Sequence, residues 1–220
     1  MKPVIIFGAG DIAEVVDYLF RETVDRTVAA FTVDREFMKT DTVFGKPLVA
    51  FEDVSAQFPP SEYEAFVALS YNRMNVLRAQ KVDAMRALGY TMTSYISPSA
   101  TILTEKIGDN CLIFEDNTLQ PFCRIGNNVT LWSGNHIGHH SVIEDNVFVS
   151  SHVVISGGVT VGHNSFIGVN STIVDHIEIA PFTLLGAGCL VQQSTEREGV
   201  YAPTSTIEKR RVPSTRLRNI

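Results

Sequence analysis

The sequence predicts an α/β N-terminal part followed by a parallel β-helix of hexapeptide repeats. From Ile107 to Val191, every sixth residue is Ile, Leu or Val, fifteen in all. If roughly half of all residues are apolar, this run would arise by chance about once in thirty thousand trials. Glycine and asparagine also recur at fixed places within the hexads. Residues 1–96 lack this period and alternate short apolar runs with helical ones.

The N-terminal part begins with an apolar run, a glycine turn and a run with helical spacing. The expected strands are 4–7, 28–33, 47–51, 64–70 and 91–96, the expected helices are 12–20 and 73–88, and 52–63 is expected to be mostly loop or a short helix. Alternating strands and helices predict a small parallel sheet covered by helices.

The turn Gly8-Ala9-Gly10 joins the first strand to the first helix, where free backbone N–H groups favour an anion. The turn lacks a third glycine, because Ala13 stands in its place. A full dinucleotide fold needs two mononucleotide halves, and fewer than 100 residues supply only one. NAD is therefore not expected, and a mononucleotide diphosphate or a purely structural turn remain as alternatives.

The hexads can be aligned, and each position has its own chemistry. The second position holds Gly at 108, 126, 138, 162, 168 and 186, and the fourth holds residues that tolerate left-handed backbone angles, namely Asn110, Asp116, Asn128, Gly134, Asn146, Gly158, Asn164, Asn170 and Gly188. This predicts a two- or three-residue strand and a tight turn in each hexad, which is typical of a parallel β-helix. With three hexads per coil, residues eighteen apart stack at ~4.8 Å.

The predicted coils number between four and five, without an inserted loop. Residues 97–100 (Ser-Pro-Ser-Ala) connect the two parts, 101–106 form an imperfect first hexad, and the chain from Gln192 must cover the open end. Cys111, Cys123 and Cys189 fall in a hexad position otherwise held mostly by small residues, so they are expected to be core thiols.

The bulk composition excludes several classes of partner. Eighteen Lys and Arg against 24 Asp and Glu give a net charge of −6, which offers no electrostatic basis for binding nucleic acid or an anionic membrane. No apolar run approaches the ~18 residues of a membrane span, and the N-terminal run is too short for a secretion signal. We therefore expect a cytoplasmic protein without nucleic-acid or membrane partners.

All six histidines lie in the repeat, and one differs from the others. His140, His152 and His176 occupy the fourth, left-handed position, where a structural role is expected. His139 precedes that position, and eighteen residues further along stands Gly157, followed by Gly158. An imidazole base beside a backbone N–H donor suits direct acyl transfer, because the base accepts a proton from the nucleophile while the amide stabilises the thioester oxyanion.

Two motifs together carry a family resemblance: Phe7-Gly8-Ala9-Gly10 near the start, and Gly134-Asn135-His136-Ile137-Gly138-His139-His140-Ser141 followed by Ser156-Gly157-Gly158. The sequence resembles bacterial sugar O-acyltransferases and nucleotide-sugar N-acetyltransferases, including those of sialic acid, bacillosamine and perosamine metabolism. The resemblance spans nearly the whole chain and implies a Rossmann-like nucleotide-sugar-binding domain at 1–96. It also implies a left-handed β-helix acyltransferase domain at 97–220, assembled as a homotrimer.

The same resemblance implies a reaction and its site. Acetyl-CoA would donate its acetyl group to an amino group on a nucleotide-linked amino sugar, with His139 as general base, Gly157 as oxyanion donor and no metal. The implied CoA contacts are Gly157, Gly158, Val169 and Ala187. The implied nucleotide-sugar contacts are Gly10, Asp11, Ile12, Asp34, Ser70, Tyr71 and Asn72.

Two departures from the family pattern leave alternatives open. The family commonly has Glu or Asp directly after the catalytic His, whereas this chain has His140, so either another acid such as Glu144 or Asp145 serves or the base is weaker. The second departure is that only part of the family's C-terminal closing pattern is present, at 199–203. Beyond it, the tail carries five basic residues that could contact CoA phosphates or be a solvated tail, namely Lys209, Arg210, Arg211, Arg216 and Arg218.

Two other functions remain as alternatives to N-acetylation. The first is O-acylation of a sugar hydroxyl or another small molecule. The second is a trimeric β-helix zinc enzyme, which resembles this chain at Ile137-Gly138-His139 but would need a second histidine where Glu144 stands.

Overall fold

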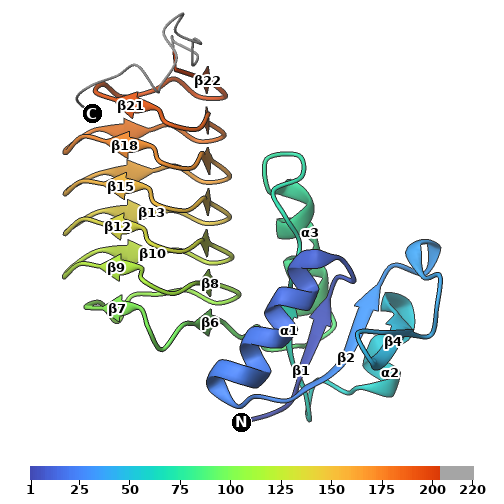
Figure 1. Cartoon of the computed structure of the whole chain (residues 1–220). Coiled ribbons are helices and arrows are strands. Elements are labelled where there is room, and N and C mark those ends of the chain that lie inside the picture. Colours follow the sequence, from blue (N-terminus) through green and yellow to red (C-terminus); the bar gives the residue numbers. More distant parts are fainter. Residues whose placement is uncertain (204–220) are drawn as a thin grey trace, which may run out of the picture.

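The computed structural model of the chain describes residues 1–203, and the basic tail with Lys209, Arg210, Arg211, Arg216 and Arg218 lies outside the described residues. Figure 1 shows an N-terminal unit of helices and strands beside a tall column of stacked coils. None of the helices within residues 1–203 has the length and apolar character that a membrane span needs.

The N-terminal unit contains one five-stranded sheet with the order β3-β4-β2-β1-β5. Its strands are β1 (Val4–Phe7), β2 (Val28–Val33), β3 (Thr42–Val43), β4 (Lys46–Ala50) and β5 (Glu64–Val67), its α-helices are α1 (Asp11–Val24), α2 (Val54–Gln57) and α3 (Val76–Ala87), and its 3₁₀ helices are η1 (Arg35–Phe37) and η2 (Phe51–Asp53). Neighbouring strands are parallel except β3 and β4. The predicted parallel sheet is therefore confirmed, with an antiparallel edge.

Helices cover both faces of this sheet because side chains of β1 alternate between the faces. Val4 and Ile6 pack with α1, whereas Ile5 and Phe7 pack with α2 and α3. Helix α3 begins three residues later than predicted, since Arg73, Met74 and Asn75 have positive φ angles of 53°, 52° and 64°.

The predicted strand 91–96 is wrong as a single strand of this sheet. Met92 forms an isolated bridge with Ala65. Tyr95 and Ile96 instead form β6, which pairs with β8 (Leu112–Ile113) of the coils. The segment divides because its backbone groups bond first to the N-terminal sheet and then to the first coil.

The coils form three parallel sheets, consistent with a left-handed β-helix of hexapeptide repeats. The seven-stranded sheet holds β6 (Tyr95–Ile96), β8 (Leu112–Ile113), β11 (Thr130–Leu131), β14 (Phe148–Val149), β17 (Phe166–Ile167), β20 (Leu184–Leu185) and β22 (Val200–Tyr201). The six-stranded sheet holds β7 (Thr101–Ile102), β9 (Thr118–Leu119), β12 (His136–Ile137), β15 (Val154–Ile155), β18 (Thr172–Ile173) and β21 (Leu190–Val191). The four-stranded sheet holds β10 (Arg124–Ile125), β13 (Val142–Ile143), β16 (Thr160–Val161) and β19 (Glu178–Ile179).

The predicted stacking of residues eighteen apart is confirmed throughout the middle of the column, for example between Arg124 and Val142. The aliphatic residues at the first position of each hexad are all buried from Ile113 to Val191, and Ile107, at the start of the column, is half-buried. Every fourth-position residue named above has a positive φ angle. Glycine is needed at the second position for a different reason, namely the lack of space for a side chain. At Gly138, a Cβ would lie 2.5 Å from the backbone of the next coil.

Four asparagines form a ladder along one corner of the column, which we call the asparagine corner (Asn110, Asn128, Asn146 and Asn164). Each side-chain amide donates to the next side-chain oxygen, over 2.8, 2.8 and 3.3 Å. Both ends reach the N-terminal unit, since Asn110 Oδ1 accepts from the Val67 N–H at 2.7 Å and Asn164 donates to the Met74 carbonyl at 2.8 Å. The ladder therefore fixes the N-terminal unit to the column at two places.

Arg78 on α3 adds a buried cation to the same contact. Its Nε donates to Asn128 Oδ1 at 3.1 Å, and its Nη2 donates to the carbonyls of Asn128 and Asn146 at 3.0 and 3.2 Å. Burial lowers the pKa of Arg78 to about 10, because desolvation disfavours the charged form. Sequence patterns gave no sign of this residue's role.

Candidate active site

His139 lies at the tip of the turn between β12 and β13. Its backbone is fixed by the stacked coils: the His139 N–H donates to Gln120 Oε1 at 3.3 Å, and its carbonyl accepts from the Gly158 N–H at 2.9 Å. Its side chain is exposed. The column therefore holds the backbone of this residue and leaves the imidazole available. We call this edge, with residues 121–122, 139–140, 157–158 and 175–176, the His139 corner.

The imidazole of His139 lies directly over Gly157. A Cβ at position 157 would be 2.6 Å from Cε1 and 2.8 Å from Nε2 of His139. Gly157 has no positive φ angle, so glycine is needed here for the close approach of the ring and not for backbone conformation. The structure thus brings the predicted base and the predicted oxyanion donor together.

The Gly157 N–H has no hydrogen-bond acceptor within residues 1–203. At comparable turn tips a side chain accepts this hydrogen bond: Glu144 Oε2 accepts from the His163 N–H at 2.8 Å, and Asp145 Oδ1 accepts from the Asn127 N–H at 2.7 Å. Within residues 1–203, the Gly157 N–H donates to no such acceptor. A donor of this kind beside a base can stabilise an oxyanion.

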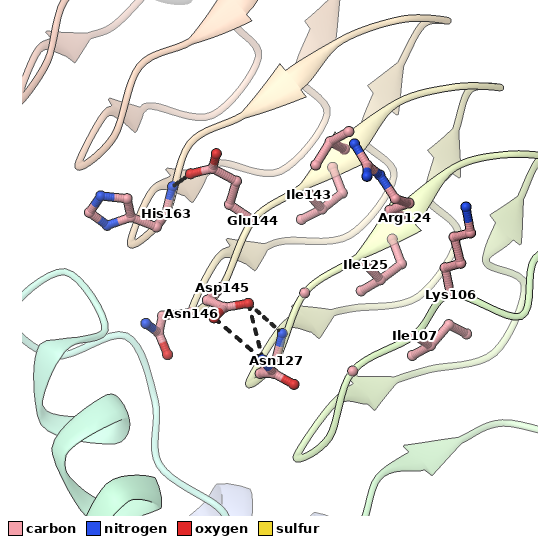
Figure 2. Close-up of a pocket in the computed structure, with 13 residues that line it drawn as sticks. Lys106, Ile107, Arg124, Ile125, Asn127, Ile143, Glu144, Asp145, Asn146 and His163 are labelled. Carbon is pink, nitrogen blue, oxygen red and sulfur yellow. Dashed lines mark hydrogen bonds between the residues drawn. The ribbon is translucent and has the colours of Figure 1, made fainter.

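Neither acid suggested by the sequence supports His139 within the chain. Figure 2 shows Glu144 and Asp145 at the asparagine corner, bonded to His163 and Asn127. That corner lies across the four-stranded sheet from His139. The polar side chain that contacts the His139 ring is instead His140, whose Nδ1 is 3.1 Å from Nδ1 of His139.

An open groove of about 790 Å³ lies over the four-stranded sheet, and Figure 2 shows the residues that line it. Lys106 and Arg124 lie along one side, and Glu144, Asp145 and His163 lie along the other. His139, Gly157 and the predicted CoA and nucleotide-sugar contacts do not line it, whereas the two candidate acids do.

Val169 and Ala187 share a second corner, where both are exposed and the Gly188 N–H bonds to the Val169 carbonyl at 2.8 Å. The six-stranded sheet separates this corner from the His139 corner. One chain therefore does not bring these predicted CoA contacts next to His139. Gly158 does lie at the His139 corner, with φ 66° and His176 so close that a Cβ would be 2.5 Å from its Nδ1.

A cavity of about 500 Å³ lies at the carboxyl ends of β1 and β2. Asp34, predicted for the nucleotide-sugar, lines this cavity together with Gly8 and Ala9 of the glycine turn. Ligands of open parallel sheets commonly bind at this edge. Gly10, Asp11 and Ile12 do not line it: Gly10 caps α1, and Asp11 is its first residue.

Lys81 on α3 also lines this cavity and was not predicted. Its Nζ lies 2.5 Å from Asp34 Oδ1, and 5.1 and 5.4 Å from the ring centres of Phe7 and Phe51. The cavity thus combines an ammonium group, a carboxylate and apolar walls. The available signal was a lysine among the apolar residues of the predicted helix.

Ser70, Tyr71 and Asn72 do not line the cavity, although the preceding Leu69 does. The Tyr71 ring packs against the β-helix, with its centre 5.1 Å from that of Phe148 and 4.7 Å from that of Phe166. This segment therefore contributes to the contact between the two units.

The cysteines are buried and free, in agreement with their predicted place in the core. Burial raises the pKa of Cys111 to about 12 and of Cys123 to about 11, and it also raises the pKa of Cys189. A neutral thiol is a poor nucleophile and a poor metal ligand. Residues 1–203 contain no group of three or more His, Cys, Asp or Glu side chains placed to hold a metal ion.

Comparisons with known proteins agree with this fold. Residues 122–157 and 140–175 match the family described as bacterial transferase hexapeptide (six repeats). A comparison with curated proteins found no match.

Similar solved structures cover nearly the whole chain. A mutant of perosamine N-acetyltransferase from Caulobacter crescentus, in complex with CoA and GDP-perosamine, is 22% identical over 96% of this chain and 98% of that one, with a TM-score of 0.83. The acetyltransferase domain of PglB from Neisseria gonorrhoeae is 20% identical over 92% and 97% (TM-score 0.81). WeeI from Acinetobacter baumannii is also 20% identical over 92% and 97% (TM-score 0.79). The chain therefore carries the bacterial transferase hexapeptide repeat within a fold that it shares with these proteins.

Proposed function

We propose that the protein is an acetyl-CoA-dependent N-acetyltransferase that acts on an amino group of a nucleotide-linked amino-deoxy sugar. The observation that carries this proposal is the His139 imidazole over Gly157, whose N–H donates to no acceptor within residues 1–203. The solved structures with CoA and GDP-perosamine bound support the same donor and acceptor classes.

The chemistry is a direct transfer. The amine attacks the thioester carbonyl while His139 Nε2 accepts its proton, and the Gly157 N–H stabilises the resulting oxyanion. Collapse of the tetrahedral intermediate breaks the C–S bond, forms the amide and releases CoA, whose sulfur takes up the proton. A free amine is a stronger nucleophile than a hydroxyl, which suits a base without a neighbouring carboxylate.

The two units divide the substrates. We assign residues 1–96 to a Rossmann-like domain that binds the nucleotide-sugar in the cavity beside Asp34 and Lys81, where the ammonium suits a diphosphate. We assign 97–220 to the left-handed β-helix acyltransferase domain, with Gly157, Gly158, Val169 and Ala187 contacting CoA. Gly10, Asp11, Ile12, Ser70, Tyr71 and Asn72 remain predicted sugar contacts.

A homotrimer would bring the separated CoA contacts to the site. Val169 and Ala187 lie on another corner than His139, so a neighbouring chain must supply them. We expect this assembly in the cytoplasm, where acetyl-CoA and nucleotide-sugars are available.

The test is CoA release from acetyl-CoA, followed with a thiol reagent, in the presence of UDP-, dTDP- or GDP-linked amino sugars. We expect release with one of these acceptors and none with its hydroxyl analogue. Mass spectrometry should find the acetyl group on the sugar nitrogen. Transfer to the hydroxyl analogue alone would establish O-acylation instead, and no acetyl transfer to any acceptor would refute the proposal.

A further inference from the structure

The turn at the His139 corner carries two imidazoles in contact. Nδ1 of His139 lies 3.1 Å from Nδ1 of His140, and the rings are nearly perpendicular at 84°. In a neutral imidazole one nitrogen donates and the other accepts. Two Nδ1 atoms at this distance therefore share one proton, and each ring determines the tautomer of the other.

We propose that His140 is a positioning residue that holds the proton of His139 on Nδ1. This leaves the lone pair of His139 on Nε2, the atom that lies 2.8 Å from where a Cβ of residue 157 would be. Within residues 1–203, no group forms a hydrogen bond with that Nε2. The inference rests on the proposed function, in which His139 Nε2 is the base.

Two features hold the His140 ring in place. Its backbone has the positive φ angle of the fourth hexad position, 61°. Its ring packs on Phe122, with centres 4.8 Å apart and an interplanar angle of 34°. The other ionisable side chains of this corner, Asp175 and His176, lie one coil beyond Gly157 and are 3.8 Å from each other.

Two substitutions of His140 distinguish the loss of the hydrogen-bond acceptor from a change in the shape of the turn. His140→Phe keeps a ring but removes the acceptor, and Phe122 and Phe182 already occupy fourth positions with φ 67° and 60°. His140→Asp restores an acceptor that stays ionised, and Asp116 occupies a fourth position with φ 58°. Asp116→Phe, at the second corner of the same chain, is the control for placing a phenyl ring at such a position.

The tautomer is read directly by ¹⁵N NMR of the histidine side chains, assigned with His139→Gln. We expect His139 to carry its proton on Nδ1 in the wild type and to lose this preference in His140→Phe. A proton on Nε2 in the wild type, or an unchanged tautomer in His140→Phe, would overturn the proposal. This measurement needs no turnover, so it stands even if no acceptor is acetylated.

Kinetics gives the second test. His140→Phe should lower kcat about 10–100-fold, the usual effect of losing a group that orients a functional residue, with both KM values within about 2-fold. His140→Asp should recover most of kcat, whereas Asp116→Phe should behave as the wild type. Full activity of His140→Phe, or no recovery in His140→Asp, would contradict the assignment.

Discussion

Replacing Gly157 with alanine tests the central contact of the site. The added Cβ would lie 2.6 Å from Cε1 of His139, whereas ordinary contacts begin at 3.4 Å. The imidazole must therefore move by about 1 Å, and a misplacement of this size can cost about 10²-fold in rate. The N–H of residue 157 remains, so the loss reports on the base and not on the oxyanion donor.

Gly157→Ala should lower turnover without lowering the free energy of unfolding by a comparable amount. The backbone at 157 has no positive φ angle, and alanine at a compatible position usually stabilises a protein by about 0.4–1 kcal/mol. Because the His139 side chain is exposed, it can swing into solvent. Urea unfolding should therefore give a free energy of unfolding within about 1 kcal/mol of the wild-type value.

A double-mutant cycle with His139→Ala completes the test. His139→Ala alone should lower kcat at least ~10²-fold, as expected for a lost general base. If Gly157→Ala acts by displacing the imidazole, it should cost little more in the His139→Ala background. Wild-type turnover of Gly157→Ala, or equal losses in both backgrounds, would refute this reasoning.

Three further outcomes follow from the cavity, the contact between the units and the thiols. Lys81→Met should raise KM for the nucleotide-sugar about 10-fold, the effect of one lost charge-assisted bond, and leave KM for acetyl-CoA unchanged in steady-state kinetics. Arg78→Met leaves buried carbonyls unsatisfied and should lower the free energy of unfolding in urea by about 1–3 kcal/mol. Cys111 and Cys123, whose pKa values are raised by burial, should react with a thiol reagent at pH 8 only after unfolding; rapid reaction of the native protein would contradict their burial.

The same thiols give a pH dependence with a definite sign. The folded-state pKa of Cys111, about 12, lies above the ordinary value of 9.0, so the unfolded chain loses this proton first. Its contribution to stability is complete below pH 9 and should fall as pH rises from 9 towards 12. Urea unfolding across this range should show a shallower decline in Cys111→Ala.

The β-helix was predictable because its rule is local. Each hexad needs an aliphatic core residue and a residue that accepts positive φ, and both requirements are visible in one chain. The proximity of His139 to Gly157 was predictable for the same reason, since stacking pairs residues eighteen apart. The orientation of the His139 and His140 imidazole rings was not predictable, because it depends on side-chain contacts such as that of Phe122 with His140.

The contacts between the N-terminal unit and the column correspond to no repeating pattern in the sequence. Arg78, Tyr71 and the asparagine corner join segments far apart in sequence, and no period relates the N-terminal unit to the coils. Glu144 was a reasonable candidate for supporting His139 by its place in the sequence. It lies at the asparagine corner because the two-residue strand β13 separates its turn from the turn that carries His139.

Helix α3 links the two proposed substrate sites. Lys81 faces the cavity at the N-terminal sheet, and Arg78, one turn earlier, is buried against Asn128 and Asn146 of the column. Since one rigid helix carries both side chains, the cavity cannot tilt relative to the coils without breaking the buried bonds of Arg78. In the function we propose, a sugar anchored by its nucleotide would be presented at a distance set by this helix. Loss of Arg78 should therefore raise KM for the nucleotide-sugar more than KM for acetyl-CoA, although Arg78 does not line the cavity.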